Sequence, residues 1–129
     1  DLDGGTRTAA ITCGFVALAI ALERMIREQK IASWPIQYQL AAVSVGLKEG
    51  TALVDLKYDE DSQADVDLNV VQTPQGELVE VQGTAEHKRF RREQLDELLK
   101  LAEEGLRSHF QVQRKILDDL KNAKFFSSF

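Results

Sequence analysis

Apolar residues follow one another almost without interruption from Ala9 to Leu22, and charged residues begin only after them, between Glu23 and Lys30. This distribution predicts a helix that begins at Thr6 or Thr8 and ends near Lys30. Since its first half is apolar on nearly all sides, we expect that half to be buried in protein. The apolar run is too short to cross a bilayer, so the sequence predicts no membrane span.

The middle of the chain alternates between apolar and polar positions, as half-buried strands do. Four such segments are separated by turn-forming residues, and they cover Leu40–Leu47, Ala52–Tyr58, Val66–Val71 and Glu77–Gln82. Apolar residues then return at helical spacing, among them Leu98, Leu106, Val112 and Leu117, and the apolar stripe that they form predicts a last helix from Arg91 or Arg92 to Ala123. This order is typical of an α+β fold, and we expect both helices to pack against one face of a mainly antiparallel sheet. We expect residues 1–129 to form a single domain.

The segment from Thr73 to Gly76 predicts the turn between the third and fourth strands, and with it their register. If Gln72 pairs with Glu77, one face of this hairpin is apolar and the opposite face is polar. The pairs on the polar face are Asn69 with Glu80 and Asp67 with Gln82. Because aspartate is disfavoured within a strand, we expect Asp67 to interact with a cation or to carry a proton.

The composition is that of a soluble globular protein and disfavours several kinds of binding site. Apolar residues make up 43% and charged residues 29% of the chain, as in ordinary soluble globular proteins. The net charge of −5 argues against a free-standing nucleic-acid binder. The single cysteine, Cys13, allows no intramolecular disulfide; we expect it to be buried and the protein to be cytoplasmic. His87 and His109 have no partner at metal-ligand spacing, so no zinc site is predicted.

The start of the first predicted helix has the residue types of an anion site. Gly4 and Gly5 allow a close approach of the backbone, and Thr6 and Thr8 are both suitable N-caps. A helix N-terminus attracts anions, and the guanidinium group of Arg7 suits phosphate oxygens. We therefore predict a bound phosphate here, although such a Gly-Gly-Thr segment is more often a purely structural helix cap.

Five carboxylates fall within nine residues of the chain: Asp59, Glu60, Asp61, Asp65 and Asp67. We interpret Asp59, Glu60 and Asp65 as parts of a solvated loop. Asp61 can fold back towards Asp67, and two converging carboxylates suit Mg²⁺, which prefers oxygen ligands. A calcium loop of the EF-hand type is disfavoured because the glycine and the distal glutamate of such loops are missing. A metal or proton-donating pair beside a phosphate would indicate phosphoryl chemistry.

Four segments together resemble the ribonuclease PH family. They are Asp-Gly-Gly-Thr-Arg-Thr-Ala-Ala-Ile-Thr at 3–12, Ala-Val-Ser-Val-Gly at 42–46, Glu-Asp-Ser at 60–62 with Asp-Val-Asp-Leu-Asn-Val-Val at 65–71, and Val-Glu-Val-Gln-Gly-Thr-Ala-Glu at 79–86. The resemblance runs through the whole chain in order and covers the C-terminal half of the family's fold. The start at Asp1, directly before a helix, fits a cut through a larger fold.

The resemblance implies a phosphorolytic 3′→5′ exoribonuclease, a tRNA nucleotidyltransferase that trims the 3′ ends of tRNA precursors. Inorganic phosphate is its co-substrate, and nucleoside diphosphates are released. By resemblance, Gly5, Thr6 and Arg7 bind the phosphate, while Asp61 and Asp67 bind Mg²⁺ and provide acid chemistry. The family further implies an N-terminal half, which is absent here or lies on a separate chain, and a homo-oligomeric ring, typically a hexamer. We expect this chain alone to be inactive or poorly soluble.

Two departures and one alternative accompany the resemblance. Cys13-Gly14 replaces a Gly-Ala pair that the family leads us to expect, which should change packing only. The basic segment from His87 to Arg92 replaces a more acidic one, and basic residues at a helix N-terminus oppose its dipole. We interpret it as a solvated turn, or as a contact for RNA phosphates or for an acidic neighbour. The alternative function is a non-catalytic structural subunit of an exosome-like RNA-processing ring.

Overall fold

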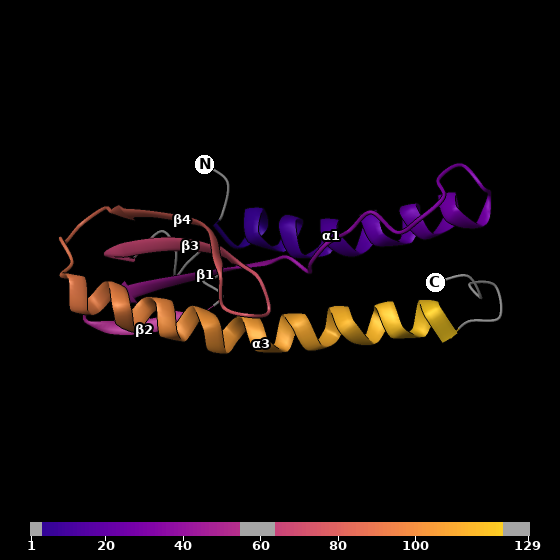
Figure 1. Ribbon diagram of the computed structural model, residues 1–129. Coiled ribbons are helices and arrows are strands. Elements are labelled where there is room, and N and C mark those ends of the chain that lie inside the picture. Colours follow the sequence, from indigo (N-terminus) through magenta and orange to yellow (C-terminus); the bar gives the residue numbers. More distant parts are fainter. Residues whose placement is uncertain (1–3, 55–63, 123–129) are drawn as a thin grey trace.

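The computed structural model describes residues 4–54 and 64–122. Its elements are the helix α1 (Gly4–Arg27), the strands β1 (Ala41–Lys48), β2 (Thr51–Val54), β3 (Val66–Gln72) and β4 (Leu78–Ala85), and the helix α3 (Arg92–Asn122) (Figure 1). The strands form one antiparallel sheet in the order β2-β1-β3-β4. The predicted α+β architecture is confirmed. The part of the second predicted strand beyond Val54 lies outside the described residues.

The main core lies between α3 and one face of the sheet. Leu98, Ala102 and Leu106 on α3 are each 0% exposed, and they pack against alternate residues of β1 and β3. Their partners on the strands are Ala41, Val43, Val45, Leu47, Val66, Leu68 and Val70. The predicted apolar stripe of the last helix is thus confirmed over most of its length. Val112 is the exception and is 60% exposed.

A glutamine takes the buried position that the stripe assigns to Val112. Gln113 is 1% exposed, and its Nε2 donates to the backbone oxygens of Thr12 and Leu40 at 3.1 and 3.0 Å. Its Oε1 accepts a hydrogen bond from Gln39 at 3.3 Å. Because these carbonyl oxygens need donors, a buried amide is favoured here over an apolar side chain.

The helix α1 covers the other face of the sheet, so the expectation that both helices share one face is wrong. Asp67 and Asn69 alternate along β3 with the core residues, and they lie with α1 around one cavity. The Thr12 hydroxyl bonds both the N–H and the C=O of Ala42, each at 3.0 Å. All of Ala41–Leu47 is buried, as expected for a central strand covered on both faces.

Figure 1 shows both helices continuing beyond the sheet, where Phe15 and Ala19 pack on Leu117.

Three expectations about the first helix are wrong. It begins at Gly4, so Thr6 and Thr8 lie within it and are not N-caps; the Thr8 hydroxyl donates to the backbone oxygen of Gly5 at 3.2 Å. Cys13 is exposed. The apolar half is also largely uncovered in this chain, with Leu18 52% exposed, because the sheet and α3 contact only one side of α1.

The length and mean hydropathy of α1 also meet the requirements for a membrane-spanning helix, contrary to the expectation from the apolar run. Its most apolar window has a mean hydropathy of 1.8, and 17% of that window is buried. Core helices of soluble proteins pass the same test. Here the packing of Phe15 and Ala19 on Leu117 makes α1 part of the fold.

The register of the β3–β4 hairpin differs from the predicted one by two residues. Asn69 pairs with Gln82 and not with Glu80. The turn is one residue longer than expected, since the Thr73 N–H donates to the Glu77 carbonyl oxygen at 2.9 Å, and an irregularity between Val71 and Gln72 adds one more residue to β4. From Val71 to Val66 the shift is two residues, and a shift by an even number leaves the side chains of Glu80 to Ala85 on their predicted faces.

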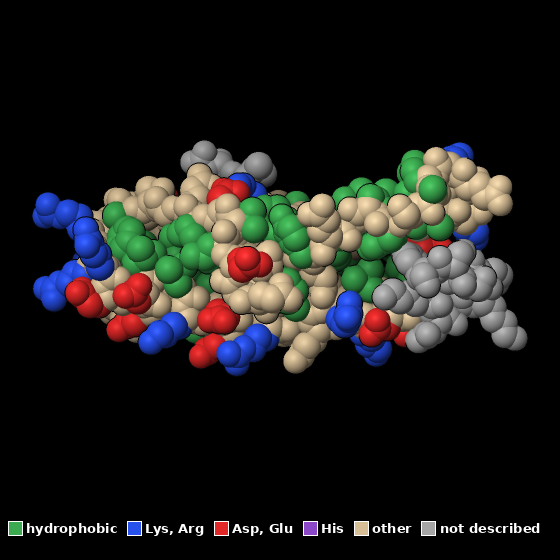
Figure 2. All heavy atoms as spheres, in the orientation of Figure 1, with side chains coloured by type: hydrophobic (Ala, Val, Ile, Leu, Met, Phe, Trp, Pro, Cys, Tyr) green, Lys and Arg blue, Asp and Glu red, His purple; other side chains and the backbone are tan. Residues whose placement is uncertain are grey.

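β4 forms the open edge of the sheet. Leu78, Val79 and Val81 are 51%, 53% and 42% exposed. Figure 2 shows apolar side chains between β4 and α3, while charged side chains follow the outer surface of α3. The face of the sheet that α3 covers at β1 and β2 is therefore open at β4.

Candidate active site

A cavity of about 730 Å³ lies between the first turns of α1 and the polar face of β3 and β4. It is lined by Thr6, Arg7, Ala10, Ile11, Asp67, Asn69 and Gln82. The structure thus brings together Thr6, Arg7 and Asp67 from distant parts of the sequence. Gly5, the remaining described residue of the predicted phosphate site, lines a smaller neighbouring groove of about 250 Å³.

Asp67, Asn69 and Gln82 form the floor of the cavity, and they belong to cross-strand rows on the face of the sheet that α1 covers. In sheet order the rows are Ala42–Val71–Glu80, Ser44–Asn69–Gln82 and Gly46–Asp67–Thr84. Arg7 bonds to the first row through Glu80, and Asp67 belongs to the third. Asn69 and Gln82 lie between them and line the cavity.

Arg7 carries the strongest indication of an anion. Its Nη2 lies 2.6 Å from Oε1 of Glu80, and both side chains are 40% exposed. Its Nη1 is buried and has no hydrogen-bond partner among the residues that the structure describes. Leaving a buried donor without an acceptor costs about 1–3 kcal/mol, and more for a charged group. A bound oxyanion would supply the missing acceptor.

Asp67 lies at the other end of the floor. Its side chain is partly buried within β3, and Oδ1 is inaccessible to solvent. The predicted partner Asp61 lies outside the described residues, as do Asp59 and Glu60, so the convergence of Asp61 on Asp67 stays a prediction. Within residues 4–54 and 64–122, no three His, Cys, Asp or Glu side chains form a metal-binding group. An Mg²⁺ site at Asp67 would therefore need a further ligand.

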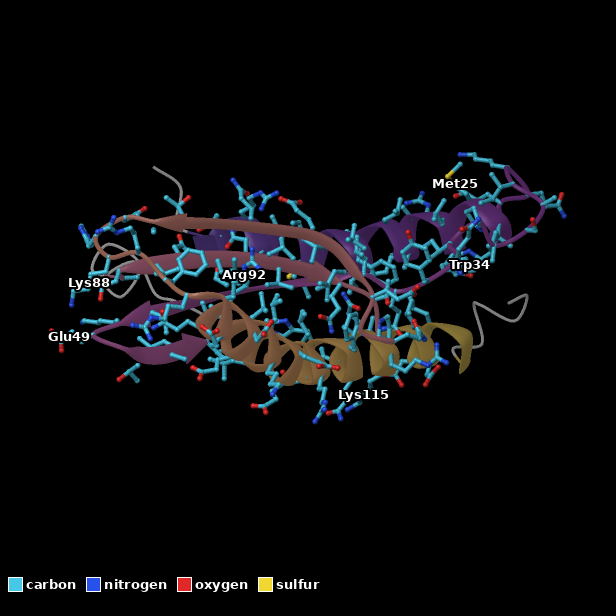
Figure 3. The ribbon with its side chains drawn as sticks, turned by 60° about the vertical axis from the view of Figure 1, so that its left-hand side comes forward. Met25, Trp34, Glu49, Lys88, Arg92 and Lys115 are labelled. Atoms are coloured by element: carbon cyan, nitrogen blue, oxygen red, sulfur yellow. The ribbon has the colours of Figure 1, made fainter. Side chains whose placement is uncertain are left out.

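Asp65 is not part of a solvated loop, contrary to expectation. Its side chain is 14% exposed, and Oδ2 accepts a hydrogen bond from the backbone N–H of Glu49 at 3.1 Å and lies 3.8 Å from Lys88 Nζ. Figure 3 shows Glu49 and Lys88 at the same end of the sheet. Glu49 and Gly50 both have positive φ, as a type I′ turn requires. Asp65 therefore fixes this turn against the start of β3.

The basic segment from His87 to Arg92 is exposed in the structure except at Phe90. The segment leads into the N-terminus of α3, which is capped, because the backbone N–H of Arg91 donates to Oε1 of Gln94 at 2.8 Å. Glu93 adds a negative charge to the first turn of α3. These two contacts offset part of the cost of placing basic residues at a helix N-terminus. The contact of this segment with RNA stays a prediction.

Sequence reasoning does not find two contacts at the cavity. Glu80 was placed on the polar face but not recognised as the partner of Arg7, because the pair joins elements 73 positions apart. Ser44 was not singled out, although it is 0% exposed and its hydroxyl donates to Asn69 Oδ1 at 2.6 Å. The available signal was a lone hydroxyl inside a run of buried apolar residues.

Comparison with known proteins identifies the family. The model of the 3′ exoribonuclease family, domain 2, matches residues 38–105. Ribonuclease PH of Crocosphaera subtropica is 50% identical over 115 residues, which are 89% of this chain and 48% of the relative. The enzymes of Moorella thermoacetica and Bdellovibrio bacteriovorus are 52% and 48% identical over 118 residues, which are 92% of this chain and 47% and 49% of the relatives.

The chain spans about half the length of the curated relatives that it matches. The matches include the four strands and the start of α3, so they cover much of the architecture described above. The chain belongs to the ribonuclease PH family of 3′ exoribonucleases.

Proposed function

We propose that this chain carries the phosphate site and the catalytic aspartates of a phosphorolytic 3′→5′ exoribonuclease that trims the 3′ ends of tRNA precursors. The single observation that carries the proposal is the buried Nη1 of Arg7, a charged donor without a partner among the described residues, at the cavity that Asp67 also lines. An anion beside a carboxylate within a family of 3′ exoribonucleases favours phosphate as the attacking group.

The proposed reaction exchanges one phosphorus–oxygen bond for another. An oxygen of inorganic phosphate bonds to the phosphorus of the last phosphodiester, and the bond from that phosphorus to the 3′ oxygen of the preceding nucleotide breaks. The terminal nucleotide leaves as a nucleoside diphosphate, and the shortened RNA takes up a proton at its new 3′ hydroxyl. Arg7, Thr6 and Gly5 hold the phosphate at the positive end of α1, while Asp67 acts on the leaving oxygen at the far end of the floor.

Asp67 and Asp61 are the residues that would hold Mg²⁺. The ion takes one or two carboxylates and keeps several waters, so the donor type of Asp67 fits it. When bound, Mg²⁺ would offset negative charge on the reacting phosphates.

The exposed side of α1 supports an assembly with further protein. Leu18 and Ile20 are 52% and 44% exposed, and the matched relatives contain about as many residues again as this chain supplies. We infer that an N-terminal half covers this side of α1 and completes the RNA path. A cytoplasmic homo-oligomeric ring, as a hexamer, is the proposed state of the assembled enzyme.

The alternative is a structural ring subunit without activity. The net charge of −5 favours it, since a nucleic-acid surface is normally basic. The two functions are separated by producing the chain together with a segment corresponding to the N-terminal half of its relatives, hereafter the assembled enzyme. Incubated with a tRNA precursor, a catalytic chain releases nucleoside diphosphates only when phosphate is present. A structural subunit releases none.

A further inference from the structure

The row Ser44–Asn69–Gln82 lies between the two ends of the cavity floor, and nothing in the function proposed so far uses it. We infer that Asn69 donates a hydrogen bond to the phosphoryl group under attack, and that Ser44 is the positioning residue that orients it. The inference rests on the proposed function and assigns a further contact at the same site.

The position of the row follows from strand pairing. Glu80, the partner of Arg7, is opposite Val71, and Asp67 is opposite Thr84, so each end is one row from Asn69. Neighbouring rows on one face of a sheet are about 7 Å apart, because each strand residue advances about 3.3 Å. A phosphate held by Arg7 and a leaving oxygen near Asp67 thus place the reacting phosphorus above the middle row.

The neighbouring strand β1 sets the orientation of the Asn69 side chain through Ser44. Ser44 is 0% exposed, and its hydroxyl donates to Asn69 Oδ1 at 2.6 Å. With its oxygen occupied in this way, the amide of Asn69 offers the cavity its Nδ2 group, which is donor-only. The hydrogen bond to Asn69 therefore explains why a hydroxyl is buried in β1, where core packing alone would favour an apolar side chain.

A neutral donor suits this place in the cavity. The attacking phosphate, the phosphodiester and Asp67 are all negative, so an acceptor or another carboxylate at residue 69 would repel the reacting group. In phosphoryl transfer, charge is spread over the equatorial oxygens of the transferred group, where fixed hydrogen-bond donors act. Asn69 should therefore affect turnover more than phosphate binding, which Arg7 controls.

The test measures kcat and the KM for phosphate of the assembled enzyme. By analogy with single oxyanion donors, Asn69→Ala should lower kcat roughly 100-fold with less than about a threefold change in KM. Asn69→Asp changes one group of atoms, keeps the acceptor for Ser44, and should lower kcat at least as much. Ser44→Ala should lower kcat about tenfold, since the amide then loses its fixed orientation. Ser108→Ala, at an exposed hydroxyl on α3, is the matched control and should have no effect.

A double-mutant cycle decides between positioning and general packing. If Ser44 acts through Asn69, adding Ser44→Ala to Asn69→Ala should cost nothing further. Independent, multiplying effects, or unchanged kcat in both Asn69 variants, would overturn the inference. If Arg7→Ala impairs phosphorolysis while the Asn69 variants do not, only this inference fails. If the parent enzyme shows no phosphate-dependent release, the proposed function fails and this inference with it.

Discussion

Arg7 Nη2 on α1 and Glu80 Oε1 on β4 lie 2.6 Å apart, although 73 positions separate the two residues in the chain. The contact ties the start of the helix to the edge strand of the sheet. It engages one arm of the guanidinium group and leaves the other, Nη1, buried beside the cavity without a partner among the described residues. The pair therefore orients Arg7 towards a ligand as much as it joins two elements.

Replacing Arg7 by alanine should raise the KM of the assembled enzyme for phosphate. Hydrogen bonds to charged groups contribute about 1.5–3 kcal/mol, which corresponds to a rise of roughly 10- to 100-fold. The KM for phosphate is measured with RNA at saturation. Arg107→Ala, at an exposed position on α3, removes the same charge as a control. An unchanged KM for phosphate in Arg7→Ala would remove Arg7 from the site.

Asp67→Asn should abolish turnover and leave phosphate binding intact. The substitution keeps the shape of the side chain but removes its charge and its capacity to deliver a proton or hold a cation. Single-turnover rates report the chemistry, and calorimetric titration with phosphate reports the binding. Asp96→Asn on the exposed side of α3 is the control. Full activity in Asp67→Asn would end the catalytic role of this residue.

Leu98→Ala should destabilise the fold by about 2–5 kcal/mol, because Leu98 is 0% exposed and its loss leaves a cavity between α3 and the sheet. Urea unfolding followed by circular dichroism gives the change in free energy of unfolding. Val112→Ala, which truncates a side chain that is 60% exposed on the same helix, should change it by less than about 0.5 kcal/mol. Equal effects of the two variants would contradict the described core.

Glu28 should contribute a small pH dependence of stability in the acid range. Hydrogen bonds from Lys30 and Arg24 lower the pKa of Glu28 from 4.5 to about 2. A folded-state pKa below the unfolded value means that the contribution is present above pH 4.5 and is lost as the pH falls towards 2. In Glu28→Gln, the free energy of unfolding should lose this part of its pH dependence. An identical pH profile in the two proteins would show that the contacts of Glu28 with Lys30 and Arg24 contribute nothing to stability.

The alternation of the strands and the period of α3 were sufficient to predict the elements, because both report burial on a single face. The register of β3 and β4 was not predictable, since the irregularity at Val71 and Gln72 has no sequence signal of its own. Because the register of β3 and β4 is shifted by two residues, an even number, the residues predicted for the polar face nevertheless lie on it. The mistaken placement of both helices on one face was avoidable, because the run of small apolar residues in β1 indicates burial on both faces.

The residues of the site were predicted better than their contacts. Thr6, Arg7 and Asp67 do line one cavity, as residue chemistry and the family resemblance suggested. The partner of Arg7 and the orientation of Asn69 depend on which strands become neighbours, which no local pattern encodes. Cys13 is predicted to be buried because its neighbours are apolar, yet it is exposed, because it lines an open groove between α1 and α3 together with His109 and Val112.

The transfer of labelled phosphate tests most directly whether the cavity at Arg7 and Asp67 carries out phosphorolysis. The assembled enzyme is incubated with unlabelled RNA and inorganic phosphate labelled with ³²P, and the released nucleotides are separated. The label should appear in the β-phosphate of nucleoside diphosphates, and its appearance should require both residues. Release of unlabelled nucleoside monophosphates, or label transfer that persists in Asp67→Asn, would show that the reaction is not the one proposed for this cavity.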